Sequence, residues 1–177
     1  MTGRACGPCT LCCKVMAVEA LQKPAGRACA HLGATGGCGI YPDRPQECRV
    51  FHCAWIRDPQ LGEDWRPDRV HFLVRTDGDQ RAIFIDVDPE HPEAWRQAPY
   101  YGRIKGWSRI VPTGQGRVVV YVGRQTWLVF PEGDLNVGET GPSDVIVSGY
   151  SPGPHPRPFA RVTPSSGPER RYYLQDL

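Results

Sequence analysis

The sequence contains no long apolar run, and this absence excludes a protein with a membrane-spanning helix. No stretch approaches the 18 or more consecutive apolar residues that a bilayer-spanning helix needs. The N-terminal residues also lack the apolar core of a secretory signal peptide. The sequence therefore predicts a cytoplasmic protein that does not associate with a membrane.

Large aliphatic residues and net charge are also scarce. Leu, Ile, Val and Phe make up about a fifth of the 177 residues, only just above the range of disordered chains. The formal net charge of +2 gives no broad positive field, so nucleic-acid binding is not indicated. The 20 glycines and 18 prolines favour many turns and few long helices. Together these features predict one small domain, or a domain with an appended module, around a thin core.

Cysteine is missing from residues 54–177 but frequent before them. The eight cysteines are Cys6, Cys9, Cys12, Cys13, Cys29, Cys38, Cys48 and Cys53. Without an export signal, such a cluster more often binds metal than forms disulfides, although disulfides or free thiols stay open as an alternative. We therefore expect all eight thiols to be metal ligands.

The spacing of the first four cysteines supports this interpretation. Two residues separate Cys6 from Cys9 and Cys9 from Cys12, a distance that lets neighbouring thiolates reach one ion. Cys13 follows Cys12 directly, and on a helix two adjacent side chains diverge by about 100°. Cys12 and Cys13 would then serve different ions, or one of them is simply packed.

A helix is predicted around this adjacent pair. Thr10 is a plausible N-cap, and the apolar stripe that follows it continues to Leu21. The positive end of the helix would lower the thiol pKa of both Cys12 and Cys13 and prepare them for metal binding or redox chemistry. Lys14, Arg44 and Arg49 are candidate donors to the sulfur atoms, although ordinary solvated surface positions explain them equally well.

The order of several short motifs resembles one known family. The motifs are Cys6-x2-Cys9-x2-Cys12-Cys13, Cys29-x-His31-Leu32, Gly37-Cys38-Gly39-Ile40-Tyr41, Arg44-Pro45, Cys48-Arg49 and Phe51-x-Cys53. Over about residues 6 to 57 the chain is similar to the CxxCxxCC zinc- or iron-chelating family, also described as YkgJ-like cysteine-cluster proteins. The resemblance implies metal chelation by these cysteines in a bacterial cytosolic protein. Flagellin lysine N-methylases carry a related cluster, but no nucleotide-type G-x-G-x-x-G follows a strand here.

The identity of the metal stays open at this stage. Eight thiols divide into two tetrahedral four-cysteine zinc sites. The run Cys6-x2-Cys9-x2-Cys12 also matches the first three ligands of a bacterial ferredoxin, although Met16 and Ala17 stand where the fourth ligand and its proline would be. Zinc is the first expectation, and iron or an iron–sulfur cluster is the alternative.

Histidines and aromatic residues beside the cysteines are interpreted conservatively. His31 and His52 are expected to be hydrogen-bonding neighbours rather than ligands, because eight thiols are already available. Tyr41 and Phe51 either keep water from the metal or pack in the core. His71, His91 and His155 are interpreted as ordinary surface or strand residues. The acidic run Asp86-x-Asp88-x-Glu90 beside His91 is assigned to a strand-to-helix junction rather than to a metal site.

Alternating apolar residues after Cys53 predict hairpins. Strands are expected over 70–76 and 81–87, joined through Asp77-Gly78, and over 118–122 and 125–130, joined through Gly123-Arg124. Residues 92–98 and 100–110 are predicted to be helical, the second with a core-facing stripe of Tyr100, Ile104, Trp107 and Ile110. Further strands are expected over 145–150 and 159–162, followed by a loosely attached Pro-rich arm.

These elements define the predicted organisation and function. The fold class is α+β: a Cys-rich metal-binding module over residues 1–57 packs on antiparallel β-hairpins with one or two helices over residues 58–150. A Pro-rich extended tail covers residues 151–177. The predicted function is zinc or iron chelation through the eight cysteines, in a structural or regulatory role. The alternatives are an iron–sulfur-dependent oxidoreductase or methyltransferase-related enzyme, and a thiol redox sensor or metal carrier.

Overall fold

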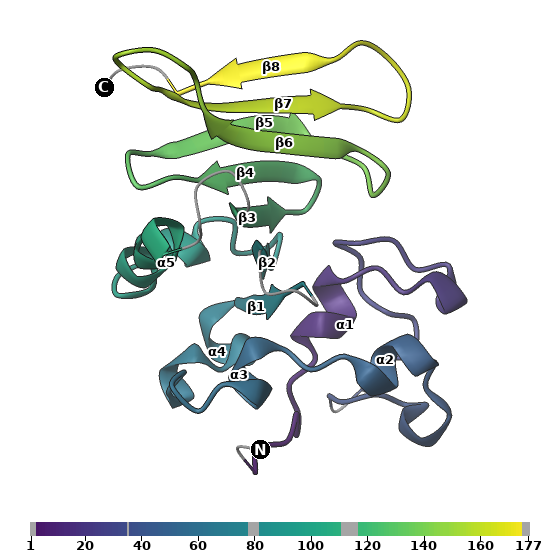
Figure 1. Cartoon of the computed structure of the whole chain (residues 1–177). Helices are drawn as coiled ribbons and strands as arrows, with labels where there is room; N and C mark the ends of the chain where they lie inside the picture. Colours follow the sequence, from purple (N-terminus) through teal and green to yellow (C-terminus); the bar gives the residue numbers. More distant parts are fainter. Residues whose placement is uncertain (1–2, 35, 78–81, 111–116, 175–177) are drawn as a thin grey trace. The chain divides into compact units, whose positions relative to one another are not determined.

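The computed structural model describes residues 3–34, 36–77, 82–110 and 117–174 (Figure 1). The chain forms two compact units. Unit 1 comprises Met1–Arg75 and Ile85–Trp95, and unit 2 comprises Thr76–Phe84 and Arg96–Leu177. The structure has mixed α/β content with two antiparallel sheets and few helices, as predicted at this level. The predicted boundaries after residues 57 and 150 do not coincide with this division. All eight cysteines belong to unit 1.

Unit 1 begins with a series of helices of three to five residues. They are α1 (Leu11–Val15), η1 (Glu19–Leu21), η2 (Tyr41–Asp43), α2 (Gln46–Val50), α3 (Ala54–Arg57), η3 (Glu63–Trp65) and α4 (Pro67–Val70). Prolines interrupt this region, and Pro67 occupies the first position of α4, where a missing N–H costs nothing. Helices this short are not stable alone, so tertiary contacts must hold them in place.

The first predicted hairpin is present. Strands β1 (Phe72–Thr76) and β2 (Ala82–Val87) lie within the predicted ranges. Most of the predicted turn between them falls on residues 78–81, outside the described part of the chain. The strand order of this sheet is β1-β2-β3-β4-β5, and β2 contributes residues to both units.

The second hairpin also forms as predicted. Strands β3 (Arg117–Val122) and β4 (Gln125–Val129) pair antiparallel, and Val122 faces Gln125 across the two-residue turn. Gly123 has a φ of 61°, the conformation that the first position of this turn requires and that glycine adopts without strain. The next strand, β5 (Asp134–Glu139), pairs with β4 and was not predicted.

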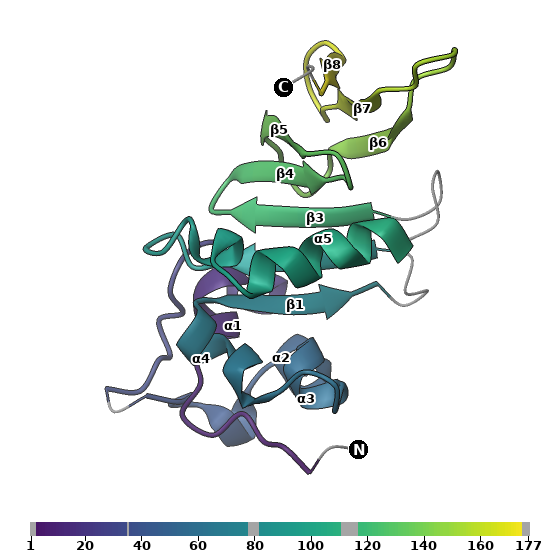
Figure 2. The same cartoon turned by 90° about the vertical axis from the view of Figure 1, so that its left-hand side faces the viewer.

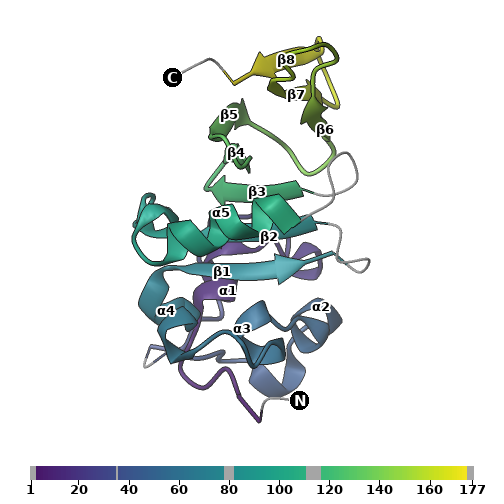
Figure 3. The ribbon, with the colours of Figure 1, turned by 60° about the vertical axis from the view of Figure 1, so that its left-hand side comes forward.

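One longer helix, α5 (Tyr100–Ile110), has the predicted bounds, whereas residues 92–98 form only the short η4 (Ala94–Arg96). Helix α5 contacts β3 and β4, and Figures 2 and 3 both show it lying along β3. Ile104 is fully buried, as its stripe predicts. Ile110 is 78% exposed, so the predicted stripe is wrong at the last turn of the helix.

The Pro-rich end of the chain is more ordered than predicted. Strands β6 (Val145–Tyr150), β7 (Pro158–Thr163) and β8 (Arg170–Tyr173) form a second sheet in that order (Figure 1). The first two were expected, but β8 pairs with β7 where a loose arm was predicted. The prediction of a loose arm was wrong because Pro168 is the last proline, and the residues after it can pair with β7.

The core of unit 2 joins its two sheets. Its buried members are Val119, Leu128, Phe130, Leu135, Val137, Ala160 and Val162. They come from β3, β4 and β5 of one sheet and from β7 of the other, with Phe130 just after β4. No helix within the described residues is long and apolar enough to cross a bilayer.

Candidate functional site

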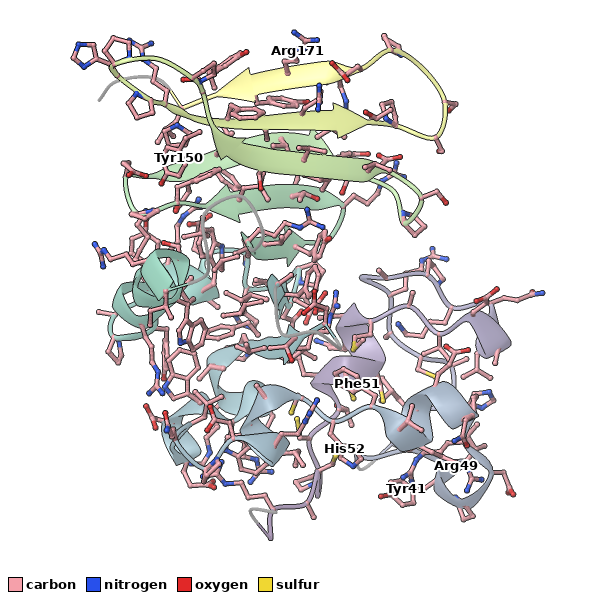
Figure 4. The ribbon with its side chains drawn as sticks, viewed as in Figure 1. Tyr41, Arg49, Phe51, His52, Tyr150 and Arg171 are labelled. Carbon is pink, nitrogen blue, oxygen red and sulfur yellow. The ribbon has the colours of Figure 1, made fainter. Side chains whose placement is uncertain are left out.

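The eight cysteines are free thiols, and seven of them are partly buried. Cys6 is the exposed one. Sulfur atoms lie close to the side chain of Phe51 in Figure 4. No disulfide joins these eight cysteines, so the free-thiol form of the alternative stays open beside metal binding.

Helix α1 is shorter than predicted. It ends at Val15 because Met16 adopts an extended conformation, so the predicted continuation to Leu21 is wrong. Thr10 occupies the predicted N-cap position but its side chain makes no capping hydrogen bond. The early end places both adjacent cysteines in a single helical turn.

Cys12 and Cys13 differ in acidity, which contradicts the expectation that the helix start lowers both. The pKa of Cys12 is raised, first by its hydrogen bond to Cys13 and then by burial and neighbouring thiolates. The pKa of Cys13 is lowered by the same hydrogen bond and by the charge of Lys23, against the effect of burial. The shared hydrogen bond therefore makes Cys13 the more acidic thiol of the pair.

One set of thiols surrounds the N-terminal side of α1, and we call Cys6, Cys9, Cys12 and Cys53 the first set. Cys9, Cys12 and Cys53 pack against the buried Leu11, Val15 and Leu73, with Phe51 beside them. Burial raises the pKa of both Cys9 and Cys53, and the charge of Cys6 adds to this at Cys53.

Backbone contacts hold the first set together. The N–H of Cys9 donates to the carbonyl of Cys6 at 3.1 Å, which closes the Cys6–Cys9 turn. The Arg4 guanidinium donates to the carbonyls of Trp55 at 2.7 Å and Asp58 at 3.2 Å. These bonds fix the segment before Cys6 against α3, which begins directly after Cys53.

The remaining cysteines, Cys13, Cys29, Cys38 and Cys48, form the second set. The N–H of Cys29 donates to the carbonyl of Cys13 at 2.9 Å. Leu32 bonds to the carbonyl of Cys29 at 3.2 Å and forms an isolated β-bridge with Cys38. Burial and then the charges of Cys13, Cys38 and Cys29 raise the pKa of Cys48, so this thiol lies within electrostatic reach of the other three.

Lys23 is a buried cation that the sequence analysis did not single out. Its ammonium donates to the carbonyls of Lys14, Met16 and Pro24 around the end of α1, where a positive charge is favourable. Burial lowers the pKa of Lys23, and the nearby thiols, with Cys29 the strongest, oppose that change. Lys23 therefore provides a positive charge beside the second set.

The residues expected to donate to sulfur have other partners. Lys14 bonds to Asp88 at 3.0 Å and Glu90 at 2.7 Å. Arg49 donates to the carbonyl of Arg44 at 2.8 Å, and the Arg44 guanidinium lies 3.7 Å from the ring centre of Tyr41. Figure 4 shows the labelled Tyr41 of η2 and Arg49 of α2 near each other.

The aromatic and histidine neighbours of the cysteines divide between core and surface. Tyr41 is 57% exposed, so it does not shield a metal from water, whereas Phe51 packs beside the first set. The His52 imidazole lies 3.1 Å from the carbonyl of Val50, which agrees with its interpretation as a hydrogen-bonding neighbour.

No three sulfur atoms of the described cysteines lie together as closely as the ligands of a bound ion. A tetrahedral zinc with bonds of about 2.3 Å holds its sulfurs about 3.8 Å apart. Among the described residues, one group of three or more potential ligands has all its ligand atoms within 4.8 Å of one another, and it contains no cysteine: His71, Asp88 and His91. The two sets must therefore contract if they bind a metal.

Comparison of the chain with protein-family models, with curated proteins and with solved structures gives no match. The resemblance to the CxxCxxCC family thus stays a prediction from the cysteine motifs.

Proposed function

We propose that this protein binds two zinc ions through its eight cysteines and that these ions stabilise the fold of residues 1–57. The first set would hold one ion and the second set the other. This is the Cys-rich metal module of an α+β protein, and the metal supplies folding free energy that the short helices of this region lack.

The observation that favours two ions is the position of Cys12 and Cys13 on one turn of α1. Cys12 interacts with Cys6 and Cys9, whereas Cys13 neighbours Cys48 and is bonded through its backbone to Cys29. Two four-thiol sets result, and four thiolates are the complete ligand set of a structural zinc site. Such a site is closed to further ligands, which favours a structural role over a catalytic one.

The charge of the sites also favours this assignment. Four thiolates and one Zn²⁺ leave a net charge of −2, which needs compensation in a partly buried place. The Lys23 ammonium supplies a positive charge at the second set. The alternative of an iron–sulfur cluster uses the same thiolates, and its visible absorption distinguishes it from colourless zinc.

Metal counting in paired variants tests the proposal. The full chain would be purified anaerobically and its metal measured by elemental analysis. We expect two zinc ions in the unchanged protein and one in the variant Cys9→Ser with Cys53→Ser, which damages only the first set. The variant Cys29→Ser with Cys38→Ser should also retain one ion, and each of these variants is the control for the other.

A crossed variant makes the grouping decisive. Cys9→Ser with Cys29→Ser removes one thiol from each set and should lose both ions under conditions where the within-set variants keep one. Equal metal content in the crossed and within-set variants would contradict the division into two sets. Absence of metal from the unchanged protein, with all eight thiols reactive, would contradict metal binding itself.

A further inference from the structure

Two histidines and an aspartate meet at the open end of the β1–β2 hairpin, away from the cysteines in the sequence. His71 precedes β1, Asp88 follows β2, and His91 lies in the turn after it. Their potential ligand atoms all lie within 4.8 Å of one another. Their spacing in the sequence predicts ordinary surface or strand positions, because it is the pairing of the two strands that brings His71 to the others.

The backbone holds the three residues in place. The N–H of Asp88 donates to the carbonyl of His71 at 2.8 Å, which continues the strand pairing by one step. The N–H of His91 donates to the carbonyl of Asp88, also at 2.8 Å, and closes the turn. His71 has a φ of 60°, an uncommon left-handed conformation for a residue other than glycine. The hairpin end therefore fixes where the three side chains start.

The three side chains differ in solvent exposure, and the exposed one lies where an ion would enter from solvent. Asp88 is buried at 4% exposure, His71 is partly buried and His91 is exposed. The two imidazole rings stack with their centres 3.6 Å apart. Bonds of about 2.0–2.2 Å to nitrogen and oxygen place neighbouring ligand atoms about 3.0–3.5 Å apart, so atoms that lie within 4.8 Å of one another need to approach by about 1.8 Å at most. The exposed His91 can supply this approach by rotation about its side-chain bonds.

Lys14, whose ammonium would compete with a metal ion for Asp88, has a second partner. Lys14 contacts Asp88 at 3.0 Å, but it also contacts the exposed Glu90 at 2.7 Å. Its ammonium can therefore keep an ion pair with Glu90 when a metal binds to Asp88. The N–H of Glu90 donates to the other oxygen of Asp88 at 3.2 Å. This hydrogen bond orients the Asp88 carboxylate, as hydrogen-bond partners of metal ligands commonly do.

We infer that His71, Asp88 and His91 bind one zinc ion at the open end of the β1–β2 hairpin, in a site separate from the eight cysteines. Two imidazoles and a carboxylate are ligands of the type that catalytic zinc uses, and three protein ligands leave a coordination position for water or a further ligand. This site goes beyond the proposed structural zinc ions, which have no open position.

Imidazole signals in NMR spectra of the full chain test this site directly. Zn²⁺ alone would be added to the reduced protein while the ring nitrogens of its five histidines are recorded. We expect the signals of His71 and His91 to move together as this site takes up one zinc ion, while the signal of His155 stays unchanged. Ring nitrogen signals report metal coordination at the histidines themselves, so the site can succeed or fail separately from the proposed function.

Variants that preserve the backbone give the corresponding affinities. His91→Ala changes an exposed side chain, Asp88→Asn keeps an oxygen for the N–H of Glu90, and His71→Asn tolerates the left-handed conformation. Each should weaken zinc binding at this site at least about tenfold, because even the loss of an outer partner of a ligand costs that much. His155→Ala, at an exposed position in unit 2, is the matched control and should bind as the unchanged protein does. Unmoved signals of His71 and His91, or equal weakening by His155→Ala, would overturn the inference.

Discussion

Residues 1–57, which are part of unit 1, and unit 2 differ in how many large apolar side chains they bury. In the described part of residues 1–57 the buried hydrophobic side chains are Leu11, Val15, Val18 and Trp55, and every helix has five residues or fewer. Unit 2 has a core that joins two sheets, with Val120, Val137 and Val162 completely inaccessible to solvent. In the N-terminal region Cys9, Cys12 and Cys53 pack beside the few buried apolar side chains. On the proposed function, metal binding by the cysteines would supply the stability that this smaller buried apolar surface does not.

Chelation should separate the two regions most strongly. On the proposed function, removing zinc from the reduced protein would withdraw binding free energy on the order of 10 kcal/mol per structural ion, more than so small a core could replace. We expect amide hydrogens of residues 1–57 to exchange rapidly after chelation, while those of β3, β4 and β7 stay protected. Hydrogen exchange followed by mass spectrometry measures both regions in one sample.

Re-addition of zinc is the control for this experiment, and it should restore protection in residues 1–57. Unchanged exchange of residues 1–57 after complete metal removal would mean that their packing suffices without an ion. That result would remove the contrast between the regions and the structural role of the metal with it.

A cavity in the core of unit 2 should destabilise unit 2 and leave metal binding in residues 1–57 unchanged. Leu128 is 1% exposed and lies in the core between the sheets. Leu128→Ala should lower the free energy of unfolding of unit 2 by about 2–5 kcal/mol through lost burial and the cavity left behind. Urea unfolding measures the loss. Zinc content should not change, and a variant that lost both stability and metal would show that the two regions do not depend on separate means.

The smallest expected effect concerns a tyrosine at the edge of the same core. Burial and the hydrogen bond from Tyr150 to Glu132, 2.9 Å long, raise the pKa of Tyr150 to about 12. Because the folded state keeps this proton after the unfolded state has lost it, the free energy of unfolding should fall as pH rises from about 10 to 12. Phenolate absorbance measures the late titration.

Tyr150→Phe should reduce this pH dependence and cost no more than about 1 kcal/mol at neutral pH, since the hydrogen bond is accessible to water. Tyr101, whose pKa is also raised to about 12, would retain its own share of the dependence. Ionisation of Tyr150 near pH 10 would show that Glu132 and burial do not protect it.

The sequence predicts those elements that depend on local patterns and misses those that depend on contacts between distant residues. Two hairpins and α5 follow from alternation, turn glycine and helical spacing, all of which are local. Strand β8 was missed because Arg170–Tyr173 is polar and aromatic, and its pairing with β7 decides its conformation. Helix α1 was overestimated because an apolar stripe cannot reveal that Lys23 binds the carbonyls at the end of a shorter helix.

The candidate sites show the same limit. The cysteine spacing predicts metal ligands, and the divergence of Cys12 from Cys13 predicts either two ions or one packed thiol; both stay predictions. Which remote thiol belongs to each set depends on long-range contacts such as those of Arg4 with Trp55 and Asp58. The contact of His71 with Asp88 arises from strand register, for which no sequence motif exists.

The adjacency of Cys12 and Cys13 has a consequence for the order in which ions enter. On the proposed function, occupation of either set immobilises the peptide that presents a ligand to the other. Binding of the first ion then meets the conformational entropy cost of ordering this peptide, and the second ion binds more tightly. Uptake should therefore be cooperative and singly loaded molecules scarce.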